Sequence, residues 1–224
     1  VSHVINISGQ VMPIRKICDM AHAQGVKVLV DGAHAFAQLV FNIPDLHCDY
    51  YGASLHKWLS SPLGAGILYV SKENQDSIWP LIGPSKGEEL GIAKFNHTGT
   101  HPVATDLTIE DSIEHYKLIG PARKQARLKF LQQYWTSQIM DMPGVMYNTP
   151  KQDTRICAIA NIGIKGMPPA TLAKILFEKY KIYTVGIDTG NVVGCRITPN
   201  VFTTTKELDQ LVAAIKELAV AAAV

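Results

Sequence analysis

The 224-residue sequence lacks several features that would place it in a specialised class of protein. No apolar run approaches the ~20 residues that a membrane-spanning helix needs, so we expect no membrane partner. A formal net charge of +2 gives no electrostatic reason to expect a nucleic-acid partner. The four cysteines are widely spaced and include no Cys-x-x-Cys pair, which argues against a metal site or disulfide framework and favours the cytoplasm.

What is present is an ordinary globular composition, with 47% hydrophobic and 18% charged residues. The first segments read as strand, helix and strand, at Val1–Ser8, Pro13–Gln24 and Val26–Val30. The last of these is short and continuously apolar, which is typical of a parallel strand buried on both faces. The order predicts a βαβ unit with a right-handed crossover.

Two more strands are expected at Cys48–Ala53 and Ile67–Val70, with a short helix at Phe36–Val40. The Pro62–Gly66 turn is too short for a parallel crossover, so the strand that follows it should run antiparallel. Residues 71–101 read as loops around a short helix at Asn74–Trp79.

The second half begins with helical patterns and continues as a smaller α+β region. Apolar periodicity and turn signals predict helices at Thr105–Tyr116, Pro121–Asp141 and Pro169–Tyr180, a closing helix from Thr205 without a full capping box, and strands near Val145–Tyr147, Arg155–Ile162, Ile182–Val185 and Val192–Thr198.

Reactive side chains follow two of the predicted strands. Asp31 ends the first apolar run, and Ser54, His56 and Lys57 follow the second. Ligands of open α/β sheets bind outside the carboxyl ends of the strands, so both groups should share one edge. A lysine that can form a Schiff base and an aspartate that can hold a pyridinium nitrogen protonated suit a phosphorylated aldehyde cofactor.

Plainer interpretations exist for each residue alone. Asp31 before a glycine could be a turn aspartate, and a His-Lys pair is usually solvated. Trp58 and the apolar stretch Gly64–Val70 flank Lys57, however, so the lysine should lie in a buried segment. The combination favours the cofactor site.

The stretches Val-Asp-Gly-Ala-His-Ala (30–35) and Ser-Leu-His-Lys (54–57), with the tail around Arg196, resemble the class V aminotransferase family of pyridoxal-phosphate enzymes. Within it they are most similar to the isopenicillin N epimerase-like and cysteine desulfurase-like branches. The resemblance implies an α/β fold with a three-layer, mostly parallel sheet. Residues 1–120 would form the cofactor-binding large domain, incomplete at its amino-terminal side, and 121–224 a connecting helix and small C-terminal domain.

The resemblance also implies roles for individual residues around pyridoxal 5'-phosphate. Lys57 would be the catalytic Schiff-base lysine and Asp31 the partner of the pyridine nitrogen. Ser54 and His56 would donate to the phosphate, and Asn6 and His34 would donate to the phenolic oxygen. Ala33 would lie against the face of the ring. A packed imidazole at His56 and a turn-capping Asn6 remain the alternatives.

Two further residues come from the same resemblance. Thr100, in Thr-Gly-Thr, would reach the phosphate of a neighbouring subunit and so implies a homodimer, although a plain loop is the alternative. Arg196 would bind the α-carboxylate of an amino acid substrate, because a guanidinium matches a carboxylate bidentately. Its alternative is a strand-edge arginine paired with an acidic neighbour. His97 and His101 lack a third ligand for a metal.

The reaction depends on cysteine placement. A desulfurase needs a thiol shortly before the arginine, but Val185–Val193 contains none, and Cys195 should point away from the side of Arg196 in a strand. Epimerisation or transamination at the α-carbon is therefore favoured. Desulfurase or lyase chemistry is the second hypothesis. A fragment without activity is the third, since family members carry a further segment before the position of Val1.

Overall fold

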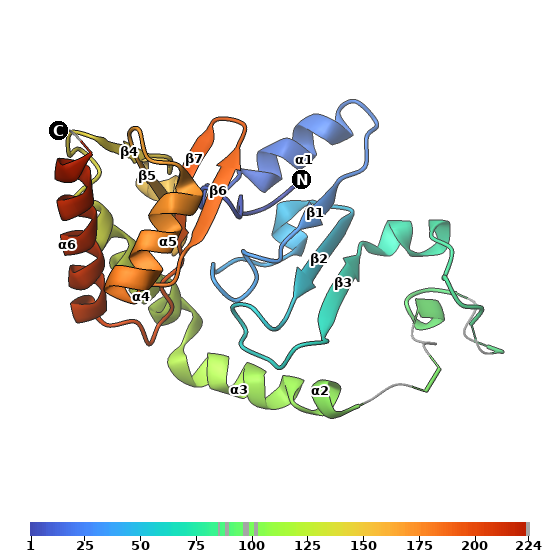
Figure 1. The fold of residues 1–224 in the computed structure, drawn as a ribbon. Coiled ribbons are helices and arrows are strands. Elements are labelled where there is room, and N and C mark those ends of the chain that lie inside the picture. The colour runs from blue at the N-terminus through green and yellow to red at the C-terminus, as the bar shows by residue number, and fades with distance from the viewer. Residues whose placement is uncertain (85, 88–89, 96–98, 101–102, 223–224) are drawn as a thin grey trace. The chain divides into compact units, whose positions relative to one another are not determined.

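The computed structural model describes residues 1–84, 86–87, 90–95, 99–100 and 103–222. The chain divides into two compact units. Unit 1 consists of Val1–His3 and Pro13–Ile119, and unit 2 of Val4–Met12 and Gly120–Val224. Figure 1 shows their elements in chain order. The cofactor-binding and small domains expected from the sequence stay a prediction.

Unit 1 contains a three-stranded sheet in the order β1-β2-β3, with β1 at Leu29–Asp31, β2 at Tyr50–Ser54 and β3 at Gly66–Val70. The first pair is parallel and the second antiparallel, which confirms the predicted direction of the strand after the Pro62 turn. The helix α1 (Ile14–His22) precedes β1, as the sequence predicted. The expected α/β class is therefore confirmed.

Two expected elements of the amino-terminal region are wrong. Val1–Ser8 is not a continuous strand, because Ser2 and Val4 form only isolated bridges and the chain then turns so that the Gly9 N–H donates to the Ile5 carbonyl. Phe36–Val40 is a series of turns rather than a helix, and Ala37 has a positive φ of 58° that no α-helix allows.

The other regular elements of unit 1 are short helices. The expected helix at Thr105–Tyr116 is split at Thr108 into two pieces, and the one near Asn74 is a 3₁₀ helix. Their bounds are η1 Pro44–Leu46, η2 Lys72–Ser77, η3 Ala93–Phe95, α2 Ala104–Leu107 and α3 Ile109–Ile119. In the described part of the chain, no helix is long and apolar enough to span a bilayer.

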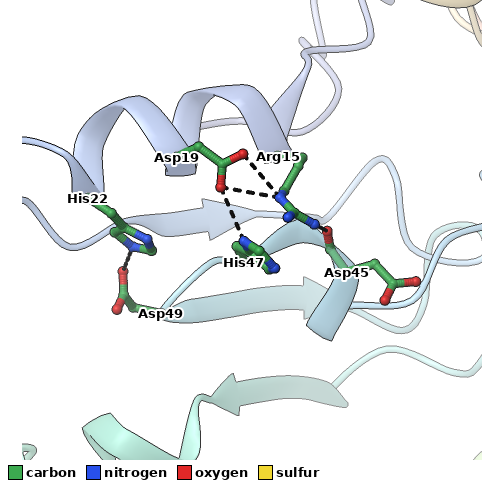
Figure 2. A network of polar contacts seen from close by, with 6 residues as sticks. All are labelled: Arg15, Asp19, His22, Asp45, His47 and Asp49. Carbon is green, nitrogen blue, oxygen red and sulfur yellow. Dashed lines mark hydrogen bonds and ion pairs between the residues drawn. The ribbon is translucent and has the colours of Figure 1, made fainter.

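Side chains tie α1 to η1 and to the start of β2, as Figure 2 shows. Asp19 on α1 accepts hydrogen bonds from the guanidinium of Arg15 and lies 3.1 Å from the imidazole of His47. At the other end of the helix, Nε2 of His22 lies 2.8 Å from the Asp49 carboxylate. The described residues contain no group of three or more His, Cys, Asp or Glu placed to hold a metal.

Unit 2 contains an antiparallel sheet in the order β4-β5-β7-β6. The expected elements are found with shifted bounds. The helix α4 ends at Thr136 rather than Asp141, β5 begins five residues later than predicted, and β6 spans Val185–Thr189 rather than Ile182–Val185. The bounds are α4 Pro121–Thr136, β4 Val145–Tyr147, η4 Asp153–Arg155, β5 Ala160–Ile164, α5 Pro169–Tyr180, β6 Val185–Thr189, β7 Val192–Ile197 and α6 Thr205–Ala221.

The three helices and the sheet of unit 2 enclose one apolar core. All five residues of β5 are buried, and the core includes Leu131 and Trp135 from α4, Leu176 from α5 and Ile215 from α6. The helix α6 starts with a full capping box, contrary to the expectation. The cap is Thr204, whose hydroxyl accepts from the Glu207 N–H while the Glu207 carboxylate accepts from the Thr204 N–H.

Candidate functional site

Asp31 is the last residue of β1, and its Cα pairs with that of Gly52 on β2. The side chain is anchored at one oxygen, because Oδ1 accepts a hydrogen bond of 2.9 Å from the Ala33 N–H. The Asp31 residue is exposed, and its other oxygen is directed to no described hydrogen-bond donor. A carboxylate fixed at one end in this way can receive a ligand at the other.

Ser54 is the last residue of β2, and His56 and Lys57 lie in the turn that follows it. The expectation of a buried segment holds for Leu55 and Trp58, whereas Lys57 itself is half-buried. Because β1 and β2 are parallel, their carboxyl ends meet at one edge of the sheet. The prediction that Asp31 and the Ser-Leu-His-Lys turn share one edge of a sheet therefore matches the topology, and the two strands are direct neighbours.

A hollow of about 410 Å³ lies at this edge of unit 1. Three predicted residues border it, namely Asp31, Ala33 and Ser54, together with Val1, Leu29, Val30, Gly52 and Ala53. Its wall is thus mostly apolar with one carboxylate and one hydroxyl. Such a wall and volume suit a single substituted aromatic ring.

His34 lies in the turn after β1 and is half-buried. Its Nδ1 accepts a hydrogen bond of 3.4 Å from the indole N–H of Trp58, and its carbonyl accepts one from the Gln38 side chain. Trp58 follows Lys57 directly, so this contact links the two turns that carry the predicted cofactor residues. It also fixes the ring of His34 with Nδ1 as an acceptor.

Three hydrogen-bond donors lie at the end of β2 or just after it, on Ser54, His56 and Lys57. Within the ranges that the structure describes, the side chains of Ser54, His56 and Lys57 make no hydrogen bond or ion pair. A hydroxyl, an imidazole and an ammonium left in this state suit an anionic phosphate and a carbonyl carbon. The donor set fits pyridoxal phosphate.

Arg196 and Asn6 lie in unit 2, whereas the other predicted site residues lie in unit 1. The Nη1 of Arg196 donates to the Asn6 carbonyl at 3.3 Å, and its Nε is buried without a partner among the described atoms. A buried guanidinium N–H without an acceptor is costly, and a bound carboxylate would supply that acceptor. The contact of the Asn6 side chain with a cofactor stays a prediction.

Cys195 is adjacent to Arg196 in β7 but is fully buried. Its thiol donates to the Pro169 carbonyl at 3.5 Å, and burial raises the pKa of the thiol. A buried thiol of raised pKa is a poor nucleophile.

Thr100 is exposed and follows Gly99, whose φ of +69° marks a turn. Its expected contact with the phosphate of another subunit stays a prediction. Thr98, His97 and His101 lie outside the described residues.

The sequence reasoning missed the residues that support the Asp31 turn, which we define as Asp31–Ala33. Tyr51 on β2 packs against Gly32, and His3 contacts Tyr51. Gly32 was a usable signal, because a glycine next to a strand end can mark the close approach of another group.

A family model described as Aminotransferase class-V matches residues 1–211. Isopenicillin N epimerase of Streptomyces clavuligerus is 28% identical over 237 residues, which cover 97% of this chain and 59% of that protein. A probable cysteine desulfurase of Chlamydia trachomatis is 28% identical over 186 residues, covering 78% of this chain and 45% of that protein. The chain thus spans about three fifths of the epimerase and less than half of this desulfurase.

Solved structures give the fold. The apo cysteine desulfurase from Thermococcus onnurineus NA1 superimposes with a TM-score of 0.85 at 21% identity, covering 98% of this chain and 59% of that one. At this identity the likeness speaks for the architecture alone.

Proposed function

Since the chain belongs to the aminotransferase class-V family, whose members use pyridoxal phosphate, we propose that it acts at the α-carbon of an amino acid. The proposed reaction is epimerisation or amino transfer of the kind suggested by its similarity to isopenicillin N epimerase. The main support is the edge of unit 1, where Asp31 and the Ser-Leu-His-Lys turn follow neighbouring parallel strands. Asp31 and Ser54 line the hollow there, whereas His56 and Lys57 are not among its lining residues.

The cofactor, when bound, supplies an electron sink for the charge that develops at the α-carbon. The Asp31 carboxylate would hold the protonated ring nitrogen of the cofactor. The Nζ of Lys57 would hold the aldehyde end, and the same amine would serve as the carrier of the α-proton. Ser54 and His56 hold the phosphate through their hydroxyl and imidazole.

The remaining residues orient the cofactor and substrate. His34 and Asn6 bind the phenolic oxygen, and Ala33 leaves room at the ring face. Arg196 binds the α-carboxylate, using the fork whose Nε has no other acceptor among the described atoms. Thr100 reaches the phosphate of a second copy, so the active enzyme is a homodimer.

A desulfurase is the second candidate, because probable cysteine desulfurases are among the relatives. The cysteines weigh against it, since all four are buried in the structure and the stretch Val185–Val193 has none. Sulfur transfer needs an accessible thiolate on the enzyme. We therefore rank epimerisation and amino transfer first.

Absorbance spectroscopy tests the proposal. Pyridoxal phosphate added to the chain is expected to give a protein-bound visible band that Lys57→Ala abolishes. Lys72→Ala, which removes an exposed lysine of η2, is the matched control and should retain the band. A wild-type protein that stays colourless would support the fragment without activity instead.

Product analysis then separates the reactions. Incubation with single L-amino acids is expected to yield the D-enantiomer, or an oxo acid when an amino acceptor is present. Release of sulfide from cysteine would instead favour the desulfurase.

A further inference from the structure

A buried cluster of rings adjoins the Asp31 turn. His3 is 5% exposed and Tyr51 fully buried, and Nδ1 of His3 lies 3.2 Å from the phenolic oxygen of Tyr51. Phe41 completes the cluster, with its ring centroid 4.8 Å from that of His3 and 5.7 Å from that of Tyr51. The two polar atoms thus satisfy each other inside apolar surroundings.

The phenol end of Tyr51 packs directly on the backbone of Gly32. A Cβ at Gly32 would lie 2.0–2.1 Å from the Cε1, Cζ and Oη atoms of Tyr51, so no other residue fits there. Gly32 is the central residue of the Asp31 turn, and the Ala33 N–H of that turn holds the Asp31 carboxylate. Any shift of the Tyr51 ring would therefore move the backbone of this turn and change the orientation of the Asp31 side chain.

His3 contacts the Asp31 turn directly, through its backbone, as well as through Tyr51. Its backbone N–H donates to the Asp31 carbonyl at 2.8 Å, while its ring contacts Tyr51. The Gly32 N–H donates to the Gly52 carbonyl at 2.7 Å, which fixes the turn from the β2 side. The His3–Tyr51 pair and β2 together leave the turn little freedom.

The pair is neutral near pH 7. Burial lowers the pKa of His3 to about 4. Burial, with smaller contributions from the charges of Cys48 and Asp31, raises the pKa of Tyr51 above its ordinary range. The contact is therefore a hydrogen bond between uncharged groups, and it adds no charge beside the aspartate.

We propose that Tyr51 and His3 are positioning residues that orient the Asp31 carboxylate toward the ring nitrogen of the cofactor. This inference rests on the proposed function. A phenylalanine would fill nearly the same volume as Tyr51, and a buried hydroxyl is unfavourable unless it is paired. The hydroxyl and imidazole are thus better explained by orientation of the turn than by core packing alone.

The test uses two probes without an aldehyde, so that Lys57 is not involved. One is pyridoxine 5'-phosphate, and the other is its analogue with C–H in place of the ring nitrogen. Tyr51→Phe in the full chain is expected to weaken binding of the first about fivefold, as the loss of one hydrogen bond would, and to leave the second within about twofold. Asp31→Asn should give the same pattern with a larger loss.

Controls separate orientation from folding. Tyr50→Phe removes a hydroxyl from the neighbouring position of β2 and should change neither dissociation constant. If Tyr51→Phe does not fold, His3→Leu serves in its place, with His3→Asn as a conservative variant that keeps a polar atom near the position of Nδ1. His3→Leu should then reproduce the selective loss, and His3→Asn should restore binding.

The outcomes are distinct. If Tyr51→Phe weakens the binding of both probes equally, or of neither, the positioning role is overturned. The proposed function stands in that case, provided that Asp31→Asn still weakens the binding of pyridoxine phosphate selectively. A wild-type chain that binds neither probe would overturn the proposed function together with the inference.

Discussion

All five residues of β5 in unit 2 are buried, whereas only the middle residue of β1 in unit 1 is. The sheet of unit 2 packs within a continuous apolar core that draws on α4, α5 and α6. The sheet of unit 1 leaves Leu29 and Leu68 more than half exposed and borders a hollow with Asp31. Unit 2 therefore concentrates apolar packing, and unit 1 carries most of the candidate chemistry.

The difference also shows how each unit fixes its polar residues. In unit 1, Asp31 is held by the backbone of its own turn and by the buried His3–Tyr51 pair. In unit 2, Arg196 contacts a backbone carbonyl and keeps a buried Nε without an acceptor among the described atoms. Both of these candidate site side chains are thus anchored at one end and have a further polar atom without a partner among the described atoms.

The largest expected effect tests the contrast in packing. Leu176→Ala, at a fully buried position of α5, should lower the free energy of unfolding by about 2–5 kcal/mol, because it removes buried methyl groups and leaves a cavity. The same change at Leu68, which is 56% exposed, should cost less than about 1 kcal/mol. Denaturant unfolding measures both. Equal losses would contradict the contrast between the units.

Two glycines with positive φ sharpen the comparison. Gly9→Ala in unit 2 should cost about 3 kcal/mol, because φ is +74° and the new Cβ would lie 1.9 Å from the Ile159 carbonyl oxygen. Gly25→Ala in unit 1 has the same backbone strain but open space, and should cost about 1 kcal/mol. Thermal unfolding of the two variants would refute this account if Gly25→Ala were the more damaging.

Asp49, a largely buried carboxylate of unit 1, should make stability depend on acid. Burial pushes the pKa of Asp49 upward, but hydrogen bonds from the Val28 N–H, His22 and Asn74 outweigh it and hold the pKa below its ordinary value. Since the folded-state pKa is the lower one, the stabilisation is complete above about pH 4 and is lost as the pH falls through the folded value.

Asp49→Asn should therefore cost about 1–2 kcal/mol at neutral pH and flatten the decline of stability below about pH 4. Urea unfolding between roughly pH 2 and 7 measures it. An unchanged pH profile would show that the Asp49 contacts contribute nothing. Asp188→Asn, at an exposed position of β6, is the matched control, because it removes a carboxylate outside this set of contacts.

The smallest effect concerns the capping box of α6. Thr204→Ala should cost about 1 kcal/mol, because it removes the hydroxyl that accepts from the Glu207 N–H. Thr205→Ala, one residue inside the helix, should change stability by less than about 0.5 kcal/mol. Helical circular dichroism during denaturation would follow both variants, and the reverse order would place the cap at Thr205.

Much of the fold followed from local patterns. The antiparallel direction of β3 was predictable because the connection from β2, residues 55–65, contains no crossover helix, and α5 was predictable from its proline start and apolar periodicity. Val1–Ser8 was wrong because an apolar run shows β propensity but not where the chain turns or which strand it meets. The roles of Asp31 and Lys57 were predicted from their chemistry and from family resemblance, and the structure supports only their placement, Asp31 at the end of β1 and Lys57 in the turn after β2.

The sequence by itself determined which residues carry reactive groups and that two of those groups come after strands, because local apolar runs and turn residues indicate where strands end. Tertiary structure alone decided that His3 pairs with Tyr51 and that Tyr51 closes on Gly32. Those contacts join positions up to 48 residues apart, and no local pattern encodes which distant side chains meet in a packed interior.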